Sequence, residues 1–144
     1  MTGQLDRIRD LEKLFSSDEN IVSENIVTVA SGKGGTGKTF FAANFAYQYS
    51  LSHKVLLIDA DFNLSNLHLL FNENPQKTLN TFLESKSGFD EIITKYNPNL
   101  DIIFGESGSI NSDKPSFNQI NKLLGEINNL ASKYDLILFD LGAG

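Results

Sequence analysis

Eight consecutive residues have the types and the spacing of a loop that holds phosphate groups. They are Gly32, Lys33, Gly34, Gly35, Thr36, Gly37, Lys38 and Thr39. They fit the pattern G-x-x-x-x-G-K-[ST], in which glycines let successive backbone N–H groups turn toward phosphate oxygens. Lys38 is expected to reach the β- and γ-phosphates, and the Thr39 hydroxyl is expected to bind Mg²⁺. The eight residues therefore predict a site for ATP or a related nucleotide, with Mg²⁺.

Carboxylates at two further places could complete this chemistry. Asp140 follows the apolar run 136–139 and is expected to hold Mg²⁺ through a bound water. Asp59 and Asp61 follow the apolar run 55–58. We expect Asp59 to support the Mg²⁺ side and Asp61 to orient an attacking water, because phosphoryl transfer depends on positioning and charge neutralisation. The alternative for all three is an acid in a solvated turn, since Asp-x-Gly is common in turns.

The elements around the glycine loop occur in the order that such a loop requires. The β-branched run 26–31 predicts a buried strand before it, and 38–51 predicts a helix after it. Phe41, Phe45 and Tyr49 recur at the spacing of one helix face.

Apolar runs and helical periodicity alternate through the rest of the chain. Further strands are expected at 55–58, 101–104 and 134–139, and helices at 65–71, 78–83, 89–95 and 116–132. The last helix has an apolar stripe of Ile120, Leu123, Leu124, Ile127 and Leu130. Apolar strands separated by helices predict an α/β fold, with a doubly wound, mostly parallel sheet covered on both faces. Ligands bind such sheets beyond the carboxyl ends of the strands. The loops that contain residues 32–39, residues 59–61 and Asp140 should therefore converge there.

The first 25 residues are expected to lie apart from the domain at 26–144. Residues 3–15 predict an amphipathic helix, and 16–25 predict a polar linker. The helix could cap the core or could dock a partner. The chain ends where a strand runs into a loop, so we expect it to be the N-terminal part of a longer protein.

Composition narrows the classes of function. The chain has 144 residues, of which 40% are hydrophobic and 21% charged, as expected for one globular domain. It has no cysteine, which excludes disulfides and an electron-transfer role with cysteine-bound clusters. The net charge of −6 argues against non-specific DNA binding but leaves a local basic patch open. No signal peptide or spanning run is present, which fits a cytoplasmic protein.

Three motifs in the expected order resemble those of the MinD/ParA ATPases. Residues 31–39 resemble the deviant Walker A loop of that family, and 59–61 with Asn66 resemble its switch I. Residues 140–144 resemble its D-x-x-A-G switch II, which ends here at Gly144. The resemblance implies a P-loop NTPase fold and a Mg²⁺-dependent ATPase that forms a homodimer with ATP at the interface.

The resemblance also implies roles for single residues. Lys33 corresponds to the lysine that reaches the partner subunit's nucleotide, which would make it catalytic together with Lys38 and Asp61. Asp61, Asn66 and Gly144 would lie in segments that change with the nucleotide state.

Within the family, the chain most resembles the flagellar-number regulators (FlhG, also called FleN or YlxH). Their N-terminal D-Q-A-x-x-L-R helix stimulates a signal-recognition-type GTPase, and residues 3–9 match it at Gln4 and Arg9, with Ile8 for Leu. This implies control of flagellar number or placement, a partner GTPase bound through 3–15, and membrane contact only through a region beyond Gly144. A septum-site or chromosome or plasmid partition ATPase remains the alternative, as does a binding module that activates the GTPase.

Overall fold

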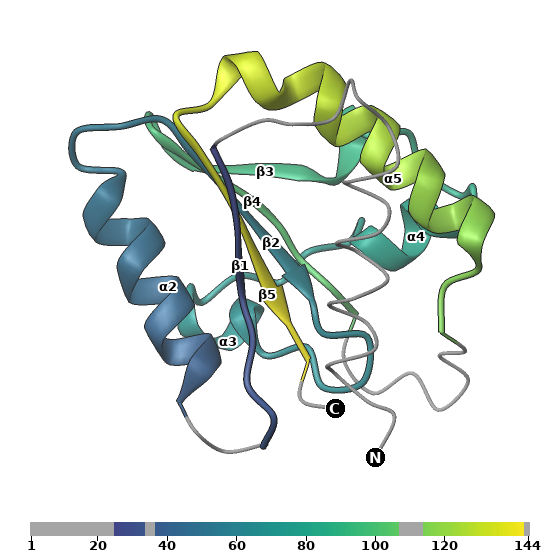
Figure 1. Ribbon diagram of the computed structural model, residues 1–144, viewed down its shortest axis with the longest axis horizontal. Helices are drawn as coiled ribbons and strands as arrows, with labels where there is room; N and C mark the ends of the chain where they lie inside the picture. The colour runs from purple at the N-terminus through teal and green to yellow at the C-terminus, as the bar shows by residue number, and fades with distance from the viewer. Residues whose placement is uncertain (1–24, 34–36, 107–113, 143–144) are drawn as a thin grey trace.

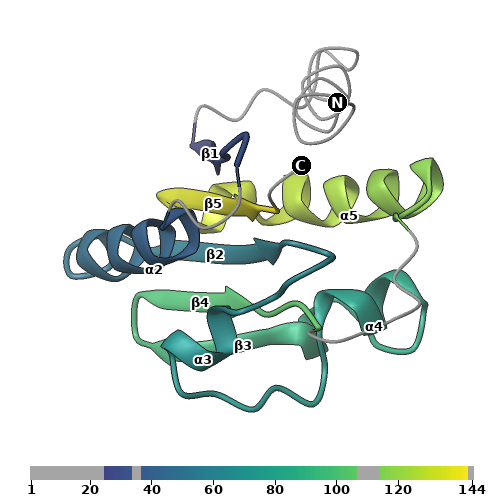
Figure 2. The same cartoon turned by 90° about the horizontal axis from the view of Figure 1, so that it is seen from below.

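A five-stranded sheet forms the centre of the protein. The computed structural model describes residues 25–33, 37–106 and 114–142. The strands are β1 (Ile26–Val29), β2 (Val55–Ala60), β3 (Ile93–Asn97), β4 (Leu100–Ile103) and β5 (Leu136–Leu141). Their order in the sheet is β1-β5-β2-β4-β3, which Figure 2 shows from top to bottom. The helix predicted at 3–15 lies outside the described residues.

The sheet is mostly parallel, as the sequence predicts. β1, β5, β2 and β4 run in the same direction, and only β3 is antiparallel to its neighbour β4. β5 comes last in the sequence but lies between β1 and β2, with Ile137 opposite both Ile26 and Leu56. The carboxyl ends of β1, β5, β2 and β4 therefore meet at one edge of the sheet.

Helices cover both faces of the sheet, and the sheet separates two hydrophobic clusters. The helices are α2 (Lys38–Tyr49), α3 (Leu67–Leu70), α4 (Leu79–Leu83) and α5 (Phe117–Leu130), with short 3₁₀ turns η1 (Asp90–Ile92) and η2 (Ala131–Lys133). α2 and α3 pack on one face, and α4 and α5 pack on the other (Figure 1). Among the described helices, none is both long and apolar enough to cross a membrane.

α5 shows how local sequence sets a helix. Ser116 accepts a hydrogen bond from the Gln119 backbone N–H at 3.2 Å, and the Gln119 side chain accepts one from the Ser116 N–H at 2.8 Å. This capping box begins the helix where Pro115 predicts it. Of the predicted stripe, Leu123, Leu124 and Ile127 are buried, and the two outer residues are partly exposed.

The helix predicted over 89–95 is wrong beyond its first turn. η1 ends at Ile92, and the chain continues as the antiparallel strand β3. The side chain of Asn97 accepts hydrogen bonds from the N–H groups of Asn99 (2.9 Å) and Leu100 (2.7 Å), which closes a tight turn into β4. The Asn97-Pro98-Asn99 sequence is the turn signal that makes this segment a hairpin.

β1 is less buried than its β-branched sequence predicts. Ile26 and Val29 are partly buried, but Val27 is 44% exposed. β1 is the outer strand of the described sheet and pairs with β5. The strand therefore exists as predicted, but the prediction of a fully buried strand is wrong.

Two of the three aromatic residues of the predicted α2 face point away from the sheet, whereas Tyr49 is partly buried and packs against the core. Phe41 and Phe45 are exposed and stack on one another, with ring centroids 5.9 Å apart. The buried residues of α2 are instead Ala42, Ala43 and Ala46. Small side chains let the helix backbone approach the strands closely, so alanine and not phenylalanine forms the packed face.

Candidate nucleotide site

The predicted chemical residues meet at the carboxyl edge of the sheet. Lys38 is the first residue of α2, Asp59 lies near the end of β2, and Asp140 lies near the end of β5. Because β2 and β5 are adjacent and parallel, Asp59 and Asp140 are register partners. Figure 1 shows these strands converging on the edge where α2 begins.

Lys38 forms an ion pair with Asp140. Lys38 Nζ contacts Asp140 Oδ1, and the two side chains are 8% and 1% exposed. Asp140 Oδ2 is also buried and makes no hydrogen bond to any described residue. A buried carboxylate oxygen without a donor is costly, so this oxygen marks a place where another partner would be stabilised.

Asp59 lies beside this pair and is held by its own loop. It is 1% exposed, and its Oδ1 accepts a hydrogen bond from the Asp61 N–H at 3.1 Å. Its Oδ2 accepts a hydrogen bond from the Ser65 hydroxyl. Burial raises the pKa of Asp59 to about 6, the two hydrogen bonds lower it, and the nearby charges of Asp140 and Asp61 raise it. The site therefore concentrates negative charge that a cation would relieve.

Asp61 faces the loop that follows β5. Its Oδ1 accepts hydrogen bonds from the N–H groups of Asn63 (3.1 Å) and Leu64 (2.9 Å), so the carboxylate shapes its own turn. A Cβ atom placed on Gly142 would lie 2.6 Å from Asp61 Oδ1. Only glycine at position 142 lets the two loops approach this closely.

The start of α2 has the features of an anion site. Gly37 precedes the helix with φ +81°, a left-handed conformation that favours glycine. No side chain caps this end of the helix, and its first turn carries no acidic residue. The backbone N–H groups at a helix N-terminus, together with its dipole, favour a phosphate group.

The other predicted site residues differ in how exposed they are, and some of them lie outside the described residues. Lys33 and Asn66 are exposed, and Thr39 is partly buried in the first turn of α2. Lys33 contributes its backbone oxygen to a hydrogen bond from the Ser31 hydroxyl at 2.8 Å. Gly32 is exposed before the loop. Gly34, Gly35, Thr36 and Gly144 lie outside the described residues.

Two residues of the site were missed by sequence reasoning. Ser65 is completely buried against Asp59, and Gly105 lies directly behind Ser65. The one available signal was that Gly105 follows β4 at the same edge of the sheet as the other loops.

The described residues fit a magnesium ion bound together with a nucleotide. Mg²⁺ keeps several waters and takes about one or two protein carboxylates, usually with phosphate oxygens. No group of three or more acidic, histidine or cysteine side chains occurs in the described ranges that could hold a metal without further ligands. Asp140 Oδ2, Asp59 and the Thr39 hydroxyl could supply this smaller set.

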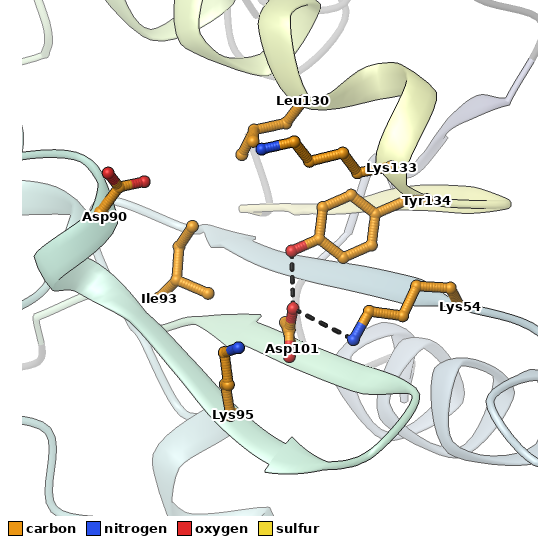
Figure 3. Close-up of a pocket in the computed structure, with 8 residues that line it drawn as sticks. All are labelled: Lys54, Asp90, Ile93, Lys95, Asp101, Leu130, Lys133 and Tyr134. Carbon is orange, nitrogen blue, oxygen red and sulfur yellow. Dashed lines mark hydrogen bonds and ion pairs between the residues drawn. The ribbon is translucent and has the colours of Figure 1, made fainter.

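A pocket of about 400 Å³ lies at the edge of the sheet opposite the candidate nucleotide site (Figure 3). Three of the residues that line it contact one another. The Tyr134 hydroxyl donates a hydrogen bond to Asp101 Oδ2 at 2.6 Å, and Lys54 Nζ lies 3.5 Å from the same oxygen. Burial and the bond to Asp101 raise the pKa of Tyr134, so the phenol remains a donor. These groups join the amino ends of β2, β4 and β5 through Asp101 Oδ2, which makes this a structural network. The other oxygen, Asp101 Oδ1, is buried and accepts no hydrogen bond from the described residues.

The fold and the site together define a P-loop nucleotide-binding protein. Residues 27–141 match the family described as the CobQ/CobB/MinD/ParA nucleotide binding domain. The chain belongs to this family.

Relatives with known names agree with this assignment. The chain is 32% identical over 144 residues to the flagellum site-determining protein YlxH of Helicobacter pylori, covering 99% of this chain and 49% of that protein. It is 35% identical over 124 residues to the septum site-determining protein MinD of Synechocystis, covering 83% of this chain and 45% of that protein. The chain thus spans about half the length of these relatives.

A solved structure shows the same fold with a nucleotide. The septum site-determining protein MinD of Pyrococcus horikoshii, complexed with Mg-ADP, has a TM-score of 0.72 and 31% identity. The match covers 83% of this chain and 49% of that chain. At the level of the family, this supports a nucleotide and Mg²⁺ as ligands.

Proposed function

We propose that this chain carries the nucleotide site of a Mg²⁺-dependent ATPase of the MinD/ParA type. The observation that supports this most directly is the buried contact of Lys38 with Asp140, next to Asp59. A buried lysine and two carboxylates at the start of a helix suit a bound phosphate chain and its metal ion.

Each residue of the site has a defined part in this proposal. Lys38 exchanges its contact with Asp140 for the β- and γ-phosphates, and residues 32–39 surround the phosphates with N–H groups. Thr39, Asp59 and Asp140 would hold Mg²⁺, which would neutralise charge on the phosphates. Asp140 Oδ2, which accepts no hydrogen bond from the described residues, is available for a metal-bound water.

Hydrolysis then needs a positioned water. Asp61 is proposed to orient the water whose oxygen attacks the γ-phosphorus, while the bond from that phosphorus to the bridging oxygen of ADP breaks. The proton that the water loses passes to an oxygen of the released phosphate. Both hydrogen bonds that Asp61 accepts from described residues go to Oδ1 and come from its own turn. We therefore infer that the loop 61–66 rearranges when a nucleotide binds, in the manner expected of a switch that includes Asn66.

Lys33 is proposed to act on the nucleotide of a second subunit. Its side chain is exposed in the single chain, and it forms no ion pair with another described residue. An exposed cation beside the phosphate loop is suited to neutralise transition-state charge across a dimer interface, as an arginine finger does.

The proposed cellular role is the control of flagellar number or placement. The match to the flagellum site-determining protein covers 99% of this chain and so extends over the segment before residue 25, whereas the MinD match covers 83%. That segment is the part proposed to bind a partner GTPase through 3–15. The protein is proposed to act in the cytoplasm.

The experiment is to measure ATP binding and turnover of the purified chain, three site variants and one control variant. Lys38→Ala is expected to abolish binding, whereas Lys33→Ala and Asp61→Ala should keep binding and lose most turnover. Lys77→Ala, an exposed lysine paired with Glu91, serves as the control and should behave as wild type. Unchanged turnover in both Lys33→Ala and Asp61→Ala would refute the assigned roles.

The cellular alternatives need a separate test. Deletion of the gene is expected to change the number or position of flagella. A change confined to septum placement, or salt-dependent DNA binding of the ATP-bound protein, would favour the septum-site or partition alternative.

A further inference from the structure

Ser65 joins the loop that follows β2 to the carboxylate of Asp59. Ser65 is completely buried, and its hydroxyl donates a hydrogen bond to Asp59 Oδ2. Asp59 Oδ1 accepts from the Asp61 N–H of the same loop at 3.1 Å. Each oxygen of this buried carboxylate is therefore held by the segment 61–65.

Gly105 confines the Ser65 side chain to this contact. A Cβ atom on Gly105 would lie 2.8 Å from Ser65 Oγ and 3.4 Å from Asp59 Cγ. Gly105 comes just after β4, the strand that pairs with β2 on the side opposite β5. The backbone after β4 thus forms a wall behind the serine, and any larger residue at 105 would push the hydroxyl away from Asp59.

The contact lies at one end of a row of polar side chains. Asp59 is the register partner of Asp140, and Asp140 contacts Lys38 at the start of α2. The row runs from the loop after β2 across two strands to the helix of the phosphate loop. A displacement of Ser65 would therefore first alter the position of the Asp59 carboxylate, which lies on the proposed metal side of the site.

We propose that Ser65 is a positioning residue for Mg²⁺: its hydroxyl fixes the Asp59 carboxylate, so that the conformation of the loop 61–66 sets the affinity of the site for the metal ion. This inference rests on the proposed function of the site as a Mg²⁺–nucleotide site. Removing the hydroxyl leaves Asp59 Oδ2 buried without its donor, which disfavours an oriented, charged carboxylate. Outer partners of metal-side groups typically change metal affinity or activity by about 10–100-fold when removed.

The test measures ADP binding by calorimetry over a series of Mg²⁺ concentrations, using the full chain. Ser65→Ala is expected to raise the Mg²⁺ concentration for half-maximal enhancement of ADP affinity by about tenfold. Its ADP affinity without Mg²⁺ should stay within about twofold of wild type, because the Ser65 hydroxyl contacts Asp59, which is proposed to act on the metal ion and not on the phosphates. Gly105→Ala reaches the same contact from the other side and is expected to shift the Mg²⁺ dependence in the same direction.

Ser50→Ala is the matched control. Ser50 is also a buried serine, but its hydroxyl donates to the Tyr47 carbonyl at the far end of α2, at 2.6 Å. It should leave the Mg²⁺ dependence unchanged. A wild-type Mg²⁺ dependence in both folded variants, or an equal loss of ADP affinity with and without Mg²⁺, would overturn the role of Ser65 alone. If the ADP affinity of the wild-type chain did not depend on the Mg²⁺ concentration, both this inference and the proposed function would be overturned.

Discussion

Asp59 and Asp140 lie side by side as register partners on β2 and β5, and both are almost completely buried. Two adjacent carboxylates in the same desolvated place repel one another, and each is compensated differently. Asp140 contacts the ammonium group of Lys38, while Asp59 accepts hydrogen bonds from Ser65 and Asp61. The difference predicts how the protein responds to pH and to mutation.

Asp59→Asn is expected to stabilise the ligand-free protein at neutral pH. The pKa of Asp59 is raised from 3.8 to about 6 in the folded protein, so the folded state binds a proton more tightly than the unfolded state. Ionised Asp59 therefore destabilises the fold by about 3 kcal/mol above pH 6, and this penalty fades as the pH falls toward 3.8. Urea unfolding at several pH values should show a gain for the variant at pH 8 that shrinks below pH 6. A gain that is independent of pH would contradict the assignment.

Lys38→Met is expected to destabilise the ligand-free chain, because it leaves the Asp140 carboxylate buried without a counter-charge. Breaking a buried pair in this way costs about 3–5 kcal/mol, whereas exposed pairs contribute about 0–1 kcal/mol. Lys77→Met removes an exposed lysine paired with Glu91 and is the control. Urea unfolding curves measured at neutral pH give the free energy of unfolding of both variants. Equally small decreases in the two variants would show that the Lys38 pair is not buried in solution.

Gly142→Ala and Gly125→Ala should act in opposite directions. Alanine at 142 places its Cβ 2.6 Å from Asp61 Oδ1, so the loops after β2 and β5 must separate. Alanine at 125 has nothing within 4 Å in the exposed part of α5 and should raise the free energy of unfolding by about 0.5–1 kcal/mol. Thermal unfolding of both variants and ATP turnover of Gly142→Ala are the measurements. Wild-type turnover in Gly142→Ala would mean that the contact with Asp61 has no part in catalysis.

Tyr134→Phe is expected to lower the free energy of unfolding by about 1–3 kcal/mol without altering nucleotide binding. The variant removes the donor to the buried carboxylate of Asp101, which is then left with Lys54 at 3.5 Å (Figure 3). Tyr47→Phe changes an exposed tyrosine and should have little effect. Chemical denaturation gives the free energy of unfolding of each variant, and calorimetry gives its affinity for ADP. Weaker ADP binding by Tyr134→Phe would contradict the purely structural role of this network.

Much of the site follows from local sequence, because its residues come directly after apolar strands or at the start of a helix. Asp59 and Asp140 could be assigned to one edge of the sheet for this reason, and the structure makes them neighbours. Ser65 could not be found in this way, since its contact with Asp59 depends on how the loop folds back and on the nearby glycine after β4. A hydrogen bond between two residues of a loop leaves no periodic trace in the sequence.

The elements that were assigned wrongly depend on tertiary context. β3 exists because a turn at 97–99 returns the chain along β4, whereas its residues alone suggested a helix. The aromatic periodicity of α2 was recognised, but periodicity does not say which face packs. Ala42 and Ala46 lie against the sheet because small residues allow close approach, and Phe41 and Phe45 are exposed.

The place of β5 in the sheet has a consequence for synthesis of the protein. Of the five described strands, β1 is made first, yet its partner in the sheet is β5, which is made after the other four and separates β1 from β2. Pairing across such a long stretch must await the late strand and bears the entropy of closing the intervening chain. The phosphate loop begins where β1 ends, so the strand before the loop is held in the described sheet only after β5 leaves the ribosome. Retention of a nascent chain on an ATP-bearing resin would then report that β5 has entered the sheet, and chains stalled before residue 136 should pass through it.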